Sequence, residues 1–131
     1  MSHNIGIIGY GGMGGWMQEN FNRTIPNAKV IGAYDIREEA AARAVRDGLT
    51  SYANVHDLLA NPQIDIIYVS TPNDSHKMYS VMALNAGKNV LCEKPAAMNA
   101  AELEEIINAS KASGKLFTVH KNRRWDADFL Q

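Results

Sequence analysis

Short apolar runs alternate with helix-forming segments along this chain. The first run, residues 4–8, is rich in β-branched side chains and stops at a cluster of glycines between Gly9 and Gly15. After the cluster, apolar residues recur at spacings of three and four, the period of one helical face. The pattern predicts a strand, a tight turn and a helix, and it then repeats. We expect six strands, at residues 4–8, 28–34, 51–53, 64–69, 89–92 and 116–120.

Five helical segments are expected between these strands, the second of them over residues 36–47. Asn54 and Asn99 are predicted N-caps, and Glu102 follows Asn99 at the spacing of a capping box. Gly48, Gly87 and Gly114 mark expected helix ends. On the predicted inner faces we place Met13, Trp16, Met17 and Phe21 in the first helix, Val55, Leu58 and Leu59 in the third, Met78, Val81 and Met82 in the fourth, and Leu103, Ile106 and Ile107 in the fifth.

The short connections between these elements determine the expected fold class. A strand can have a parallel neighbour only if a crossover connection joins the two, and a helix is the usual crossover. The alternation therefore predicts an α/β fold with a doubly wound parallel sheet. We expect residues 1–120 to form this domain, and residues 121–131 to begin the connection to a further domain.

Composition narrows the class of protein. The chain has 131 residues, of which 46% are hydrophobic, and its net charge is −1, so no nucleic acid or anionic membrane is expected as a partner. No uninterrupted apolar run is longer than that of residues 66–69, which is far too short to cross a bilayer. The single cysteine, Cys92, fits a reducing compartment and is interpreted as a small buried hydrophobe. We expect a cytoplasmic protein.

The glycine cluster carries the first chemical signal. Residues 9–14, Gly-Tyr-Gly-Gly-Met-Gly, match the G-x-G-x-x-G pattern between a strand and a helix. In that setting Gly9 permits the tight turn, Gly11 lets the backbone approach a pyrophosphate, and Gly14 allows close helix–strand packing. The pattern predicts a dinucleotide-binding Rossmann fold. A triphosphate-binding loop is disfavoured because Gly15 and Trp16 stand where that motif needs Lys and Ser or Thr.

An acidic residue follows at the expected distance. Asp35 lies 21 positions after Gly14 at the end of the second strand, where a carboxylate accepts hydrogen bonds from adenosine ribose hydroxyls and repels a 2′-phosphate. This favours NAD. Arg37 keeps NADP possible, because its guanidinium could turn toward a phosphate. Asp35 could also be a helix N-cap, a role that is compatible with ribose binding.

Two polar segments follow the fourth and fifth strands. They are residues 70–76, Ser-Thr-Pro-Asn-Asp-Ser-His, and residues 93–95, Glu-Lys-Pro. Ligands of open α/β sheets bind outside the carboxyl ends of the strands, so both segments should face the cofactor. The bond between Lys94 and Pro95 is expected to be cis.

Together these motifs resemble the N-terminal domain of the glucose-fructose oxidoreductase and myo-inositol dehydrogenase family. The resemblance rests on the glycine motif, on residues 71–73 followed by His76, on residues 93–95, and on Asn-Arg-Arg-Trp at 122–125. Their order and spacing match the family over nearly the whole chain. The resemblance implies an NAD(P)-dependent oxidoreductase that moves hydride between nicotinamide and a hydroxyl carbon of a sugar, polyol or related small molecule. We also expect a homo-oligomer.

The resemblance also implies roles for individual residues. Lys94 would lie beside the reacting carbon as the catalytic residue, and Glu93 would hydrogen-bond the nicotinamide ribose. No metal ligand is implied. The remaining cofactor-binding residues would be Gly9, Gly11, Gly12 and Met13 at the pyrophosphate, Asp35 and Arg37 at the adenosine ribose, Ser70, Thr71, Pro72, Asn73 and His76 between ribose and nicotinamide, and Arg123 and Arg124 near the nicotinamide or the border with a substrate domain.

Some alternatives stay open at this point. Lys94 could be an ordinary surface lysine, and His76 could simply begin its helix. The family has a second domain that binds substrate, and the chain stops where that domain should begin, so we expect a catalytically incomplete part of an enzyme. Trp125, Phe129 and Leu130 would then form an exposed apolar patch. The rival functions are a non-catalytic nicotinamide-nucleotide sensor and an S-adenosylmethionine-dependent methyltransferase domain.

Overall fold

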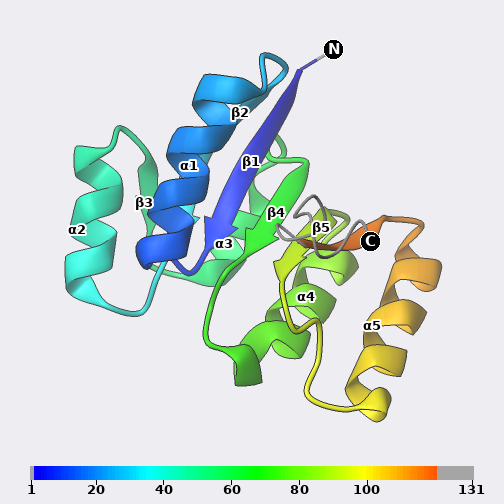
Figure 1. Ribbon diagram of the computed structural model, residues 1–131. Coiled ribbons are helices and arrows are strands. Elements are labelled where there is room, and N and C mark those ends of the chain that lie inside the picture. Colours follow the sequence, from blue (N-terminus) through cyan, green and yellow to red (C-terminus); the bar gives the residue numbers. More distant parts are fainter. Residues whose placement is uncertain (1, 121–131) are drawn as a thin grey trace, which may run out of the picture.

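The computed structural model describes residues 2–120, which form one parallel sheet between two layers of helices (Figure 1). Their order follows the predicted alternation. The strands are β1 (His3–Ile8), β2 (Ala28–Tyr34), β3 (Thr50–Tyr52), β4 (Ile66–Val69), β5 (Asn89–Glu93) and β6 (Phe117–His120). The helices are α1 (Gly12–Thr24), α2 (Glu38–Arg46), α3 (Val55–Ala60), α4 (His76–Asn85) and α5 (Ala100–Ser113), with a 3-10 turn, η1 (Asn73–Ser75), before α4.

The strand order confirms the doubly wound sheet. It is β3-β2-β1-β4-β5-β6, and every described strand pair is parallel. Strands β2 and β4 therefore flank β1 on opposite sides, and the chain reverses its direction of winding there. All strands end at one edge of the sheet, and the reversal leaves a crevice at that edge beside β1, where such folds bind ligands.

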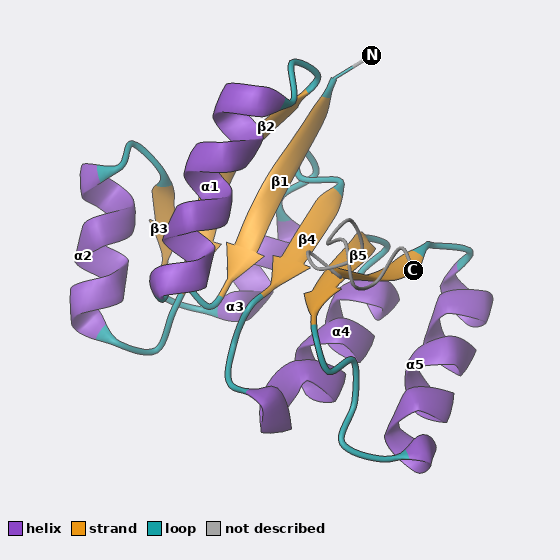
Figure 2. Cartoon of the chain, viewed as in Figure 1, coloured by secondary structure: helices purple, strands orange, loops and turns teal. Residues whose placement is uncertain are grey.

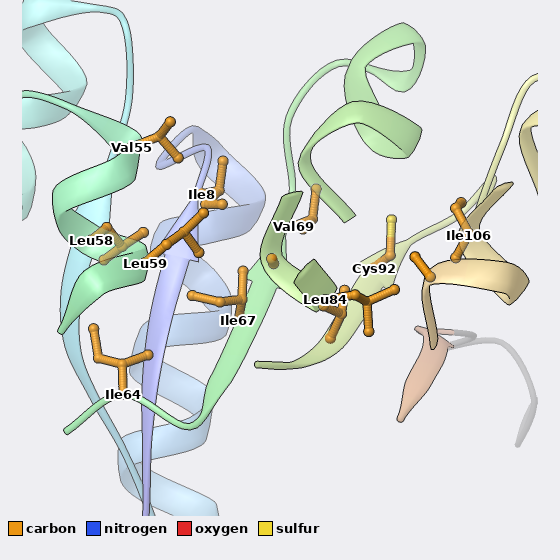
Figure 3. Packing of buried hydrophobic residues seen from close by; sticks show 13 residues of the cluster. Ile8, Val55, Leu58, Leu59, Ile64, Ile67, Val69, Leu84, Cys92 and Ile106 are labelled. Atoms are coloured by element: carbon orange, nitrogen blue, oxygen red, sulfur yellow. The ribbon is translucent and has the colours of Figure 1, made fainter. Parts of the chain in front are cut away.

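Two apolar clusters fill the space between the sheet and the helices. On one face, Met17 and Phe21 of α1 and Ala44 of α2 pack against β1, β2 and β4. On the other face, α3, α4 and α5 pack against the same sheet, and Figure 3 shows Leu58, Leu84 and Ile106 reaching it from these three helices. Because both faces of the sheet are covered near its centre, the last four residues of β1, 5–8, are all buried, as is typical of a central parallel strand.

The two predicted asparagine N-caps and the predicted glycine at the end of α5 are confirmed. The Asn54 side chain accepts a hydrogen bond from the backbone N–H of His56, and Asn99 accepts one from that of Glu102. The Glu102 carboxylate accepts from the N–H of Met98, one residue earlier than in a standard capping box. Gly114 ends α5 in the left-handed conformation, with φ of 72°.

Several predicted inner faces are wrong in part. Met13, Trp16, Met78, Leu103 and Ile107 are exposed, by 39% to 52% of their surface. The residues that touch the sheet are often smaller or polar, because such side chains let a helix approach closely. The buried positions are Gly14, Met17 and Phe21 in α1, His76, Ser80, Ala83 and Leu84 in α4, and Ile106 and Ala109 in α5. The α4 and α5 helices lie side by side (Figure 2).

Two predicted boundaries move by two residues, whereas the other predicted strand boundaries lie within one residue of the observed ones. Ile64 is buried as expected, but it lies in the turn before β4, where its N–H donates to the carbonyl of Asn61. Helix α2 begins at Glu38 rather than Ile36, because the Asp35 carboxylate accepts the N–H of Arg37 and holds the chain in an extended conformation there. The expected apolar patch at Trp125, Phe129 and Leu130 lies outside the described residues, as does the predicted connection 121–131.

Candidate dinucleotide-binding site

A cleft of about 530 Å³ opens at the carboxyl edge of the sheet. Its walls come mainly from the segments that follow β1, β2 and β4, which the sequence predicted would face the cofactor. Residues 93–95 after β5, which were predicted to face it too, are not among the residues that line this cleft. The lining residues are Gly9, Gly11, Tyr34, Asp35, Ile36, Arg37, Ser70, Thr71, Pro72, Asp74, Ser75 and Tyr79. The chain therefore has a preformed concave site at the point where the strand order reverses.

The glycine loop owes its shape to close backbone contacts. Gly9 has φ of 95°, and a Cβ atom there would lie 2.8 Å from the backbone of Ser70 and Thr71. A Cβ atom on Gly14 would lie 2.5 Å from the carbonyl oxygen of Gly9. Side chains are excluded at both positions by backbone that cannot move aside. At Gly12 no atom of residues 2–120 lies within 4 Å of such an atom, so packing within this part of the chain does not require that glycine.

Neighbouring strands hold the loop in place. The N–H of Gly9 donates to the carbonyl of Tyr34 at 2.8 Å, and the Ser70 hydroxyl donates to the carbonyl of Gly9 at 2.5 Å. Ser70 was predicted to line the cofactor site. It does line the cleft, and it also fastens the end of β4 to the loop after β1.

A second support comes from α2, and the sequence analysis missed it. Arg43 Nη2 donates to the carbonyl oxygens of Tyr10 and Gly11, the latter at 2.8 Å, and the guanidinium lies 5.2 Å from the centre of the Tyr10 ring. The Tyr10 hydroxyl donates to Asp47 at 2.7 Å. Burial, then the hydrogen bond and the charge of Asp47, raises the pKa of Tyr10 well above its usual range. The sequence indicated a helix around Arg43, but a local pattern cannot show which loop the guanidinium reaches.

Asp35 lies at the end of β2 with its side chain only 7% exposed. Its Oδ2 accepts the N–H of Tyr10 at 2.8 Å, and its Oδ1 accepts the N–H of Arg37 at 2.9 Å. The Arg37 guanidinium donates to both oxygens, at 3.1 and 3.2 Å. Burial alone would raise the pKa of Asp35, but these hydrogen bonds and the positive charge together lower it. The residue is thus an ionised carboxylate inside the cleft.

The far end of the same edge holds Glu93, the last residue of β5. Its Oε1 accepts the hydroxyl of Tyr68 on β4 and lies 2.7 Å from Nδ1 of His120 on β6. Burial first, and then the hydrogen bond to Glu93, raises the pKa of Tyr68 far above its usual range. Three adjacent strands therefore position one carboxylate. Neither Tyr68 nor His120 was predicted as a site residue, since only the strand register brings them to Glu93.

His76 lies behind the loops rather than in the cleft. It begins α4 and is 1% exposed, with Nδ1 2.6 Å from the carbonyl of Pro95 and Nε2 2.8 Å from the carbonyl of Thr71. The ring thereby joins the loops after β4 and β5. The structure places His76 at the start of its helix, which is one of the two interpretations given for it. There the ring contacts the carbonyl of Thr71 and supports the loop after β4.

The other predicted residues fall in three groups. Met13 and Asn73 are exposed beside the cleft, in the first turn of α1 and in η1. Lys94 is exposed, and no hydrogen-bonding partner for its ammonium lies among residues 2–120. Arg123 and Arg124 lie outside the described residues.

Two further predictions concern residues near the end of β5. The Lys94–Pro95 bond is cis, as expected. Cys92 is buried, which raises the pKa of its thiol to about 11, so it packs as a hydrophobe.

Comparison with known proteins decides the family. A family model described as an oxidoreductase family with an NAD-binding Rossmann fold matches residues 3–121. The chain belongs to this family, the Gfo/Idh/MocA oxidoreductases. The sequence resemblance and the fold class are thereby confirmed, and the chain is an NAD-binding Rossmann domain of the Gfo/Idh/MocA type.

Individual proteins are similar to this Gfo/Idh/MocA chain over the same region. An inositol 2-dehydrogenase of Pseudomonas syringae pv. syringae is 36% identical over 118 residues, covering 88% of this chain and 35% of that protein. The crystal structure of an NAD-binding protein from Listeria innocua matches with a TM-score of 0.93 and 41% identity, covering 99% of this chain and 38% of the other. The structure of the WlbA dehydrogenase of Chromobacterium violaceum, solved with NADH and UDP-GlcNAcA, matches with a TM-score of 0.91 and 26% identity. The match covers 98% of this chain and 38% of that protein.

This Gfo/Idh/MocA chain thus spans little more than a third of the length of such relatives.

Within residues 2–120, no helix is both long and apolar enough to cross a membrane. The same residues contain no group of three or more His, Cys, Asp or Glu side chains arranged to hold a metal ion.

Proposed function

We propose that this domain binds NAD(H) along the carboxyl edge of its sheet and is the cofactor-binding part of a dehydrogenase acting on a sugar, a polyol or a related hydroxy compound. The pyrophosphate would lie at the start of α1, the adenosine in the cleft beside Asp35, and the nicotinamide toward Glu93 and Lys94. The observation that carries this proposal is the combination of a glycine loop shaped by backbone contacts with a buried, ionised carboxylate on the next strand.

The first turn of α1 suits a diphosphate. Gly11 occupies the N-cap position, and no side chain within the described residues caps this helix. Its first N–H groups therefore remain available to an anion, and the helix dipole favours a negative charge there. Arg43 takes up the carbonyl oxygens of Tyr10 and Gly11, so these acceptors are already paired. Gly9, Gly11, Gly12 and Met13 would contact the diphosphate through the backbone.

The cleft suits an adenosine. Ile36 is 80% exposed and lines the cleft together with Thr71 and Pro72, so apolar surfaces from two loops are available to a flat base. Asp35 provides acceptors for ribose hydroxyls. We also propose a preference for NAD over NADP on account of this carboxylate.

We propose that the nicotinamide end of the cofactor binds beside β5 and the loops next to it. The nicotinamide ring supplies or accepts the hydride when it is bound. Glu93, held by Tyr68 and His120, would hydrogen-bond the ribose, and the exposed ammonium of Lys94 would orient the substrate hydroxyl and stabilise negative charge on its oxygen. Ser70, Thr71, Pro72 and Asn73 would line the cofactor between its halves, with His76 behind them. Arg123 and Arg124 are proposed near the nicotinamide or at the border with a substrate domain.

We also propose the substrate class, the assembly and the compartment of the whole protein. The inositol 2-dehydrogenase and the WlbA dehydrogenase, whose structure holds UDP-GlcNAcA, favour a sugar or polyol as the substrate of the whole protein. We further propose a homo-oligomer in the cytoplasm, the latter because a lone buried cysteine suits a reducing compartment.

Ligand titration of the 131-residue chain tests the proposed function. We expect NADH to bind with an increase in its fluorescence and to raise the unfolding temperature of the chain. S-adenosylmethionine, the ligand of the rival methyltransferase function, should neither bind nor displace NADH. Binding of S-adenosylmethionine in place of NADH, or of neither ligand, would contradict the proposal.

A further inference from the structure

Arg43 contacts the glycine loop from outside the cofactor cleft. Its Nη2 donates to the carbonyl oxygens of Tyr10 and Gly11, yet Arg43 is not among the residues that line the cleft. The guanidinium lies instead beside a separate hollow between α1 and α2, which Trp16 and Asp47 also line. An effect of Arg43 on a bound cofactor would therefore act through the loop and not by direct contact.

The two carbonyl groups belong to peptide units whose N–H groups are proposed to face the diphosphate. The carbonyl of Tyr10 shares a peptide unit with the N–H of Gly11, and the carbonyl of Gly11 shares one with the N–H of Gly12. Neither N–H has a hydrogen-bonding partner among residues 2–120. Resonance couples the two ends of a peptide unit, so a donor on its oxygen makes its N–H a stronger donor. Such cooperative strengthening is about 10–30% per bond, and here a charged donor supplies it at both units.

The same contacts fix the direction of these N–H groups. Asp35, at the end of β2, accepts the N–H of Tyr10, and Arg43 binds the carbonyl of Tyr10, so both ends of this loop residue are held. The carbonyl of Gly11 also accepts the N–H of Gly15 at 3.0 Å, the first hydrogen bond of α1. These bonds keep both carbonyls from turning toward the cleft, where they would repel a diphosphate.

Packing alone does not explain an arginine at position 43. The Nε of Arg43 is buried and has no hydrogen-bonding partner among residues 2–120. A buried polar group without a partner costs free energy. An apolar side chain could fill the same space without that cost, so the specific contribution of Arg43 is its charged donor on the two carbonyls.

We propose that Arg43 is a positioning residue for the diphosphate of the cofactor. By binding the carbonyls of Tyr10 and Gly11 from outside the cleft, it directs the N–H groups of Gly11 and Gly12 into the cleft and strengthens them as donors. Arg43 thus raises the affinity for nucleotides that carry a diphosphate and leaves the affinity for adenosine unchanged. The inference rests on the proposed function, because it requires the diphosphate to bind at the start of α1.

Ligands with and without the diphosphate distinguish this role from general support of the fold. In Arg43→Met, which keeps an apolar side chain against the loop, NADH and ADP should each bind at least about fivefold more weakly, because two charge-assisted hydrogen bonds no longer hold the loop. Adenosine meets Asp35 and the apolar walls but not the loop, so its affinity should stay unchanged. A role limited to structure would lower the affinity for all three ligands together.

The experiment titrates the 131-residue chain with NADH, following its fluorescence, and then displaces the NADH with ADP or with adenosine. The original sequence is compared with Arg43→Met and with Arg46→Met as a control. Arg46 is exposed in the last turn of the same helix and lines neither the cleft nor the hollow, so its loss changes the net charge equally. We expect the ratio of ADP affinity to adenosine affinity to fall at least about fivefold in Arg43→Met and to stay unchanged in Arg46→Met.

A lysine variant covers the case in which Arg43→Met does not fold, as judged by its thermal unfolding. In Arg43→Lys the shorter side chain holds the two carbonyls less firmly, so the same ratio should fall by about two- to threefold. Weakening of ADP and adenosine by the same factor in the folded variant, or an unchanged ratio, would overturn the inference.

The outcomes also separate this inference from the proposed function. If the original chain binds neither NADH nor ADP, the proposed function fails and the inference fails with it. If the original chain binds both, and substitution of Arg43 leaves the ratio of ADP affinity to adenosine affinity unchanged, only the inference fails.

Discussion

At the scale of single residues, Gly14 has the tightest contact in the site. A Cβ atom there would lie 2.5 Å from a backbone oxygen of Gly9, well inside van der Waals contact. Gly14→Ala must push α1 away from the loop, so we expect a loss of about 1 to 3 kcal/mol in the free energy of unfolding and weaker NADH binding. Urea denaturation and NADH titration measure both effects.

Gly15 provides the matched control in the same turn of α1. A Cβ atom on Gly15 would meet only the flexible Arg43 side chain, at 3.8 Å or more. Gly15→Ala should therefore leave the stability unchanged or raise it by up to about 1 kcal/mol, because alanine is the better helix former. Equal effects of the two substitutions would show that the close contact at Gly14 does not affect the free energy of unfolding.

Lys94 is the residue whose proposed role belongs to the reaction rather than to binding. Its ammonium is exposed and no partner for it lies among residues 2–120, so it is free to meet a substrate. In an enzyme that includes the substrate domain, Lys94→Ala should lower kcat by about 100-fold or more and leave the NADH dissociation constant nearly unchanged. Steady-state kinetics and NADH titration test this, and comparable losses in both would reassign Lys94 to cofactor binding.

At the scale of elements, Lys88 joins two neighbouring turns. Its buried Nζ donates to the carbonyl of Asn61, after α3, at 2.8 Å and to that of Ile64, before β4, at 2.5 Å. Burial lowers the pKa of Lys88. Lys88→Met leaves both carbonyls without this partner, so we expect a loss of about 1 to 3 kcal/mol in unfolding free energy by urea denaturation. Lys29→Met, at an exposed position of β2, should have little effect, and a similar loss there would contradict the assignment.

Residues of β4 and β6 hold the side chain of Glu93, the last residue of β5. Tyr68 is fully buried and its hydroxyl donates to the Glu93 carboxylate, so Tyr68→Phe removes one donor without changing the packing volume greatly. If Glu93 binds the nicotinamide ribose, this variant should bind NADH several-fold more weakly and bind ADP, which lacks that ribose, with unchanged affinity. Titrations with the two ligands give the comparison. Equal weakening of both would show a general loss of structure instead.

At the scale of the whole molecule, this chain holds a cofactor site but spans about a third of its relatives. A substrate must be held against the nicotinamide for hydride transfer, and residues 2–120 supply one side of that arrangement. We expect the 131-residue chain to bind NAD(H) and to show no measurable oxidation of inositol or glucose in an absorbance assay for NADH. Robust turnover by this chain alone would refute the expectation.

The order of the elements could be read from local patterns because each pattern has a local physical cause. Turn glycines, capping asparagines such as Asn54, and apolar runs depend on neighbours within a few residues. The inner faces of α4 and α5 could be predicted only in part, since periodicity identifies an apolar stripe but not which residues touch the sheet. Met78 is exposed for this reason, whereas Ser80 is buried.

By itself, the sequence determined the parallel α/β fold, the glycine loop and the acidic residue after the second strand, because a motif and its flanking elements are contiguous in the chain. Only the tertiary structure decided how distant side chains meet. It brought Arg43 to the glycine loop, Tyr68 and His120 to Glu93, and the Arg37 guanidinium to Asp35 in a geometry that fills the carboxylate. The physical reason is that strand register and helix packing set such contacts, and both arise only when the whole sheet has assembled.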